Sequence, residues 1–212
     1  MKIEKKVLDM SLAGIFTAII IAMSVVPFLG YIPLGFMNAT IIHVPVIIGA
    51  IILGPKYGAY LGLVFGMTSL VKATITPGVT SFVFSPFVTI VGYSGNMWSA
   101  VIAIVPRVCI GIVAYYVYKL IMKVAHGIKG SQTVALWVAG IAGGMTNTLL
   151  VMNGIYIFFG QSYAAASNKA VEHIYDVILG IILGFGVPEA IVAGILTTAI
   201  TKVLFKIMKN NG

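Results

Sequence analysis

Long apolar runs with almost no charge restrict the fold of this chain more than any other feature. Only 8% of its 212 residues are charged and 60% are hydrophobic, whereas soluble domains carry about a quarter charged residues. A helix that crosses a bilayer needs about 20 mostly apolar residues. The chain is therefore predicted to be an all-α membrane protein, a compact six-transmembrane-helix bundle that forms a single domain over residues 1–212. The helices are predicted at residues 8–27, 38–53, 57–73, 97–122, 133–159 and 187–208.

The lysines are distributed unevenly around these helices. If the N-terminus is cytoplasmic, only Lys72 and Lys169 fall on the outside. Because cytoplasmic segments carry an excess of Lys and Arg, we expect both termini in the cytoplasm and a multi-pass protein of a prokaryotic-type cell membrane. Membrane topology thus explains the net charge of +8. No nucleic-acid partner is indicated, because the lysines do not form a basic face interspersed with aromatic residues.

Two of the three connections expected outside are long. Residues 73–96 combine Ser, Thr, Gly and Pro with aromatic residues, and residues 160–186 end in VILGIILGFG, an apolar segment too short to span. Long structured loops in membrane proteins are usually lids, re-entrant segments or binding elements. We therefore expect the functional site at the external face.

Small residues recur at every fourth position in the first and third predicted helices. In lipid, close backbone approach over small residues is a principal source of helix association. Both faces are therefore predicted to be packing interfaces, either within the chain or, for the first helix, with another membrane protein. The two faces consist of Gly14, Ala18 and Ala22, and of Gly58, Gly62 and Gly66.

An arginine in the middle of an apolar segment is the strongest functional signal. Arg107 follows Pro106 about ten residues inside the helix predicted at 97–122, which is about 15 Å along the helix axis. A central arginine costs about 2.5 to 3.5 kcal/mol on insertion scales, so it needs a partner or a wet cavity. Its neighbours at helical spacing, which include Ala103 and Gly111, are small and leave space around the guanidinium.

Few acidic side chains could neutralise Arg107. The chain has five, and only Glu189, predicted at the external start of the helix at 187–208, is a serious internal candidate. A structural pair with Glu189 and an anion from outside are the two alternatives. We favour the anion, because charges inside membranes are usually functional and the arginine fork can bond both oxygens of a carboxylate.

Polar and aromatic groups near Arg107 complete the predicted site. A buried amide in lipid must find a partner or bind a ligand, and for each Asn an interhelical hydrogen bond is the equal alternative. Trp98 has the alternative role of an interfacial anchor, and His43 is predicted to be a core histidine. The candidate substrate-binding residues are Arg107, Asn147, Asn153, Tyr93, Asn96, Tyr156, Trp98 and Phe84.

Signatures of catalysis are missing from the sequence. It contains no HExxH, GxSxG or paired-carboxylate pattern. We expect no enzyme activity, no cofactor and no metal site. If ATP energises transport, another chain hydrolyses it.

Three stretches carry a resemblance to a known family: ATIIHVPVIIGAIILGPKYGAYLGLVFGMTSL, TSFVFSPF and RVCIGIVAYYVYK. Together with the six predicted helices and the small-residue face of the first helix, they make the chain resemble the substrate-binding S-components of energy-coupling-factor (ECF) vitamin transporters, most of all the pantothenate-type members. The resemblance covers essentially the whole chain. It implies a subunit that captures a vitamin from outside and reorients in the lipid bilayer to release it inside.

The resemblance also implies protein partners. S-components dock onto a transmembrane T-component that is coupled to two ABC ATPase subunits. In this family the small-residue face of the first helix contacts the T-component. The resemblance therefore assigns partner binding to Gly14, Ala18 and Ala22.

Pantothenate also fits the chemistry of the predicted site. It has one carboxylate, an amide and two hydroxyl groups, which suit one arginine with a few Asn, Thr and Tyr side chains. A folate-like or other anionic vitamin remains open, because residues 73–96 could supply aromatic side chains for stacking. A stand-alone carrier or channel for small anions, with Arg107 as the substrate or selectivity charge, is the alternative from another class.

Overall fold

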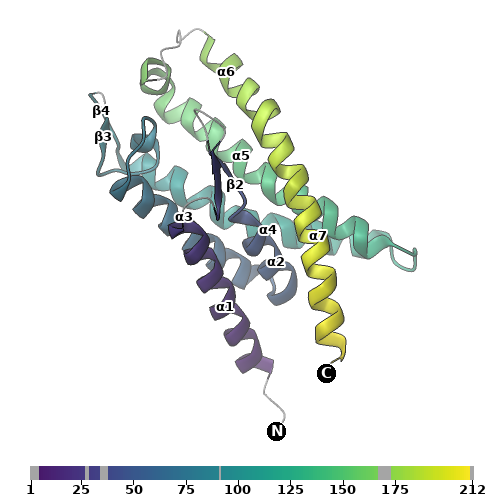
Figure 1. Ribbon diagram of the computed structural model, residues 1–212. Helices are drawn as coiled ribbons and strands as arrows, with labels where there is room; N and C mark the ends of the chain where they lie inside the picture. Colours follow the sequence, from purple (N-terminus) through teal and green to yellow (C-terminus); the bar gives the residue numbers. More distant parts are fainter. Residues whose placement is uncertain (1–4, 27–28, 34–37, 91, 167–172, 211–212) are drawn as a thin grey trace.

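The computed structural model describes residues 5–26, 29–33, 38–90, 92–166 and 173–210, which form a bundle of tilted helices (Figure 1). Five segments of the described chain are long and apolar enough to cross a membrane, and α6 and α7 belong to one of them. The described ends of the chain lie at the same end of the bundle (Figure 1). The helices are α1 (Lys5–Val25), α2 (His43–Leu53), α3 (Pro55–Ile75), α4 (Met97–Val124), α5 (Ser131–Ala166), α6 (Ile174–Ile181) and α7 (Val187–Asn210).

The second helix is shorter than predicted. Residues 38–53 were expected to be helical throughout, but Asn38–Thr40 form strand β2, which pairs antiparallel with β1 (Tyr31–Pro33). The remaining 11-residue α2 is about 16 Å long, about half of the hydrocarbon thickness. It contacts α1, α3, α4, α5 and α7, so its apolar residues form the centre of the bundle.

The prediction of a long connection at residues 160–186 was wrong where the structure describes this range, and residues 167–172 lie outside the described residues. Helix α5 continues to Ala166, and a π-helical turn, η3 (Ile182–Gly186), joins α6 to α7. The segment VILGIILGFG therefore belongs to one apolar helix over Ile174–Asn210. Glycines and Pro188 suggested a break, but the wider π turn precedes this proline, and the Val187 N–H bonds to the carbonyl of Ile182.

Close backbone contacts hold α3 against α4. A Cβ atom on Gly66 would lie 2.9 Å from the carbonyl oxygen of Ala103, and one on Gly62 would overlap the backbone at Arg107. Gly58 is packed in the same way against Gly111. The glycine face predicted in the third helix is therefore an interface within the chain, and it brings α3 next to the arginine.

Residues 76–90 and 92–96 form a cap over the ends of α3 and α4. The cap contains the short helix η1 (Ser81–Val83) and a hairpin of β3 (Thr89–Ile90) and β4 (Tyr93–Ser94). The Ser85 and Thr74 hydroxyls lie 2.7 Å apart, which ties the cap to α3. The Ser99 hydroxyl donates to the carbonyl of Phe82 at 2.7 Å, which ties it to α4.

The tight α3–α4 contact predicts that Gly62→Ala destabilises the fold. Overfilling a packed interface costs about 1 to 3 kcal/mol, and the new methyl group would meet backbone rather than a movable side chain. Thermal unfolding of the purified protein in detergent measures the loss. Gly14→Ala is the matched control, because nothing lies within 4 Å of a Cβ at that position. Equal melting temperatures for the two variants would contradict the packing argument.

Candidate substrate-binding site

Arg107 is buried in α4, with 7% of its surface exposed. Pro106 has no N–H to donate to the carbonyl of Ile102, four residues earlier. The Nη1 atom of Arg107 donates to that carbonyl at 2.7 Å. The proline thus creates an acceptor inside the bundle and the neighbouring arginine satisfies it.

Two aromatic rings flank the guanidinium. Its Cζ atom lies 5.3 Å from the ring centre of Phe84 in the cap and 5.6 Å from that of Phe65 in α3. A cation at these distances is attracted by the ring faces. Phe84 and Arg107, both candidate substrate-binding residues, therefore lie in one region, and Phe65 is a neighbour that the sequence did not reveal.

Asn147 lies in α5 at a similar depth in the bundle. A Cβ on Gly143 would lie 3.4 Å from the Ala114 side chain, and one on Gly154 would lie 3.1 Å from that of Ile102, so α4 and α5 are antiparallel neighbours. Counted from the Ala114–Gly143 contact at 1.5 Å per residue, Arg107 and Asn147 differ in depth by about 5 Å. Asn147 is 8% exposed, and its Oδ1 atom is buried without a hydrogen-bond partner in the part of the chain that the structure describes.

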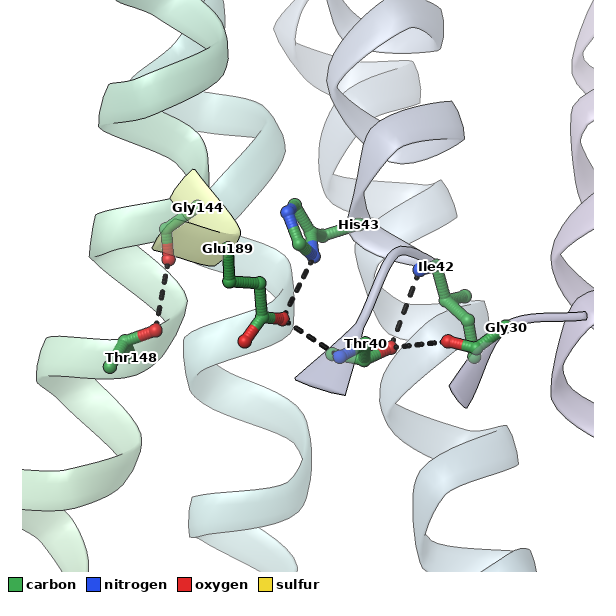
Figure 2. Close-up of polar contacts among 7 residues, drawn as sticks. All are labelled: Gly30, Thr40, Ile42, His43, Gly144, Thr148 and Glu189. Atoms are coloured by element: carbon green, nitrogen blue, oxygen red, sulfur yellow. Dashed lines mark hydrogen bonds and ion pairs between the residues drawn. The ribbon is translucent and has the colours of Figure 1, made fainter. Parts of the chain in front are cut away.

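Glu189 is deeper in its helix than predicted. It was expected at the start of a helix, but the helical segment already begins at Ile174. Its Oε1 atom accepts the backbone N–H of Thr40 at 2.9 Å and lies 3.7 Å from His43 Nδ1 (Figure 2). The carboxylate therefore connects α7 to β2 and to the start of α2.

His43 belongs to this polar cluster, although the sequence indicated only a core histidine. It is 1% exposed, and its Nε2 atom lies 3.4 Å from the place of a Cβ on Gly144. Asn147 and Thr148 follow Gly144 by one turn of α5, and the Thr148 hydroxyl donates back to the Gly144 carbonyl at 3.4 Å (Figure 2). The sequence around His43 gave only a weak signal of this role. The residues that His43 contacts in α5 and α7 are far from it in the chain, so no local pattern reports them.

The other predicted site residues are placed nearer the surface. Asn96 is the N-cap of α4, and its side chain accepts the Trp98 N–H at 2.9 Å. Trp98 is 48% exposed and stacks on Phe158 at 4.0 Å between ring centres. A role of Asn96 and Trp98 in ligand binding stays a prediction. The contacts that the structure shows for them are a helix cap and a ring stack within the protein.

Tyr93, Asn153 and Tyr156 also have local contacts. The Tyr93 ring lies 6.0 Å from that of Phe82 in the cap. Asn153 Nδ2 donates to the Leu149 carbonyl at 2.8 Å, and Tyr156 meets Tyr175 edge-on at 5.1 Å. The geometry thus brings Arg107, Asn147 and Phe84 into one region. A role of Tyr93, Asn153 and Tyr156 in binding stays a prediction.

Comparison with known proteins identifies the family. A match to the family described as "ECF transporter, substrate-specific component" covers residues 9–201. The chain belongs to this family of S-components. The family consists of transporter components, not of enzymes, and with the five apolar helices it makes the chain a multi-pass cell-membrane protein.

Two curated relatives are similar to this S-component over nearly their whole length. The pantothenic acid transporter PanT of Lactococcus lactis subsp. cremoris is 36% identical over 211 residues, which cover 98% of the chain and 99% of the relative. The pantothenate transporter PanT of Leuconostoc mesenteroides subsp. mesenteroides is 29% identical over 203 residues, which cover 93% and 92%.

A solved S-component has the same fold. The crystal structure of the S-component for biotin from an ECF-type ABC transporter matches with a TM-score of 0.50 and 18% identity, and the match covers 95% of each chain. At this identity the likeness concerns the fold alone.

The small-residue face of α1 is exposed in this S-component. Gly14, Ala18 and Ala22 point away from the bundle, whereas Phe16 and Ile20 on the other side of the helix are buried in the core. Unlike the glycines of α3, these small residues are therefore not used for packing among the described parts of the chain.

The capping geometry predicts that Asn96→Ala lowers the free energy of unfolding by about 1 kcal/mol, because Ala cannot accept the N–H at the start of α4. Thermal unfolding in detergent measures the change. Asn96→Ser is the control, since Ser is also a good N-cap. If Ala and Ser gave the same stability while Ala alone weakened ligand binding, Asn96 would be a ligand residue after all.

Proposed function

We propose that this chain is the substrate-capture subunit for pantothenate of an ECF-type ABC importer. The observation that carries the proposal is the near full-length similarity to two proteins named as pantothenate transporters. The substrate binds from outside, and the subunit reorients in the membrane on the T-component and its ATPases to release it inside. Residues 1–212 serve as one transmembrane domain with cytoplasmic ends, which agrees with the position of both described ends at one end of the bundle (Figure 1).

Arg107 binds the carboxylate of the ligand in this proposal. A guanidinium has five N–H donors in a planar fork, which can hold a carboxylate through two parallel hydrogen bonds. Phe84 and Phe65 shield the ion pair from water, which strengthens it. Asn147 supplies an acceptor for an N–H or O–H group of the ligand.

The exposed face of α1 is the proposed docking surface for the T-component. Small side chains allow two helix backbones to approach closely, and Gly14, Ala18 and Ala22 offer such a face along about two turns of the helix. The large apolar residues beside it, Ile15 and Ile19, are exposed as well. A transmembrane partner helix would therefore meet a groove of small residues bordered by isoleucines.

The proposed carboxylate contact predicts that Arg107→Ala weakens pantothenate binding at least about tenfold, since a hydrogen bond to a charged group contributes about 1.5 to 3 kcal/mol. Isothermal titration of the purified chain against a panel of vitamins measures it. Lys206→Ala is the control, because Lys206 is exposed near the end of α7. Unchanged affinity in Arg107→Ala would remove Arg107 from the site, and binding of another vitamin instead of pantothenate would disprove the proposed substrate.

The proposed docking surface predicts that Ala18→Trp leaves pantothenate affinity unchanged and prevents assembly with the T-component and the ATPases. A bulky indole would separate helices that must pack closely. Co-purification and uptake into vesicles measure assembly and transport, and Ile195→Trp on the exposed side of α7 is the control. Normal transport by Ala18→Trp would refute the docking assignment, and sustained uptake by the chain alone would favour a stand-alone carrier.

A further inference from the structure

Three buried polar side chains from different helices lie close to one another in the bundle interior. They are His43 of α2, Asn147 of α5 and Glu189 of α7. Glu189 and His43 are in direct contact, with 3.7 Å between Oε1 and Nδ1. His43 faces Gly144 of α5 (Figure 2), and Asn147 follows Gly144 by about one turn of the helix. The group is therefore a convergence of polar atoms in the interior of an apolar bundle.

Hydrogen-bonding capacity in this group is left unused. The Nε2 atom of His43 and the Oδ1 atom of Asn147 are buried and have no hydrogen-bond partner among the described residues. A buried polar group without a partner destabilises a protein, and a partly satisfied buried network is more costly than an apolar core. Their position in the bundle interior rather than among lipid-facing residues points to a partner that enters the site.

The imidazole of His43 packs closely against the backbone of α5 at Gly144. Gly144 has no side chain, and a Cβ at this position would lie 3.4 Å from His43 Nε2 and 3.1 Å from the Cα of Ala190. Any larger residue at 144 would therefore fill the region that His43 faces. The glycine leaves the imidazole opposite bare backbone, with Asn147 on the next turn.

The chemistry of the group selects a donor-rich partner. Asn147 Oδ1 and the carboxyl oxygens of Glu189 accept hydrogen bonds, and a neutral imidazole offers one acceptor and one donor. A ligand with hydroxyl groups supplies the missing donors. A ligand carboxylate is repelled by Glu189 and attracted by Arg107, so the two ends of an acid that carries hydroxyls are directed to opposite parts of the site.

We propose that His43, Asn147 and Glu189 form a hydroxyl-binding subsite that makes this protein selective for carboxylic acids bearing hydroxyl groups. The inference rests on the proposed function and extends it, because it assigns the two hydroxyl groups of pantothenate to residues other than Arg107. His43 and Asn147 contact the ligand hydroxyls. Glu189 fixes the position of His43, and its bond to the Thr40 N–H holds β2 against the subsite.

The test compares two ligands on the purified full-length chain. One is pantothenate and the other is the N-acyl-β-alanine of the same carbon skeleton that lacks both hydroxyl groups. We expect the unmodified protein to prefer pantothenate by about tenfold to a hundredfold, since each lost hydrogen bond leaves a buried partner unsatisfied. His43→Phe and Asn147→Leu should weaken pantothenate binding, leave the affinity for the deoxy acid nearly unchanged, and so reduce the preference to about onefold to threefold.

A purely structural role of these residues would give a different pattern. The substitutions would then weaken the binding of both ligands by the same factor and leave the preference for pantothenate unchanged. This result would overturn the proposal. His43→Gln, which retains a polar group, should recover part of the preference if His43→Phe does not fold. If the folded His43 and Asn147 variants kept the preference for pantothenate over the deoxy acid, these residues would not bind the ligand hydroxyls, and the proposal would be refuted.

Arg107→Ala separates this inference from the proposed function. Both ligands carry the carboxylate, so loss of Arg107 should lower the affinity for both by the same factor and leave the ratio of the two affinities unchanged. If the unmodified protein binds no pantothenate, the proposed function fails and the inference fails with it. If it binds pantothenate and the His43 and Asn147 variants keep the preference, only the hydroxyl subsite is refuted.

Discussion

The hydrogen bond from Arg107 to the carbonyl of Ile102 joins a backbone defect and a buried charge into one stable unit. Each would be costly alone, since an unpaired carbonyl and an unpaired cation both lose solvation inside an apolar bundle. Their bond of 2.7 Å also fixes the direction of the side chain. The guanidinium then needs neighbours on its other sides, and the cap over α3 and α4 must fold back for Phe84 to reach it.

Glycines determine which helices can approach the interior polar residues closely. The contact of Gly62 with the backbone at Arg107 brings α3, and with it Phe65, to one side of the arginine. On another side, Gly144 lets α2 approach α5 so closely that His43 meets bare backbone. The same absence of side chains that allows helices to pack in lipid therefore leaves room for polar groups at the centre of the bundle.

Sequence reasoning succeeded where the signal is local in the chain. Apolar length predicted five of the spanning segments, and the rarity of charge in lipid directed attention to Arg107. Asn96 carried a readable signal as well, because an Asn followed three residues later by Ser at a helix start is a capping pattern, but proximity to the predicted mouth favoured a ligand role.

It failed where tertiary contacts decide. The pairing of His43 with Glu189 joins residues far apart in the sequence, and no periodicity reports it. Gly184, Gly186 and Pro188 resemble a helix end, yet neighbouring helices hold the segment helical. Gly186, for example, packs against the Thr148 side chain. Glu189 was considered as a partner of Arg107, but its contacts with His43 and Thr40 were not predicted.

The π turn at Ile182–Gly186 sets the rotational phase between two halves of one helix. A π turn holds one residue more than an α turn between the same hydrogen-bonded groups, and one residue corresponds to about 100° of rotation. The buried positions follow this phase, with Ile178 before the turn, Ile182 at its start and Ala190 after it. Deletion of one residue from the π turn would rotate α6 by about 100° relative to α7. The buried face of α6 would then turn away from the core while α7 stayed in place. Chain length in this short stretch is therefore under tighter restraint than the identity of its exposed side chains, such as Leu183.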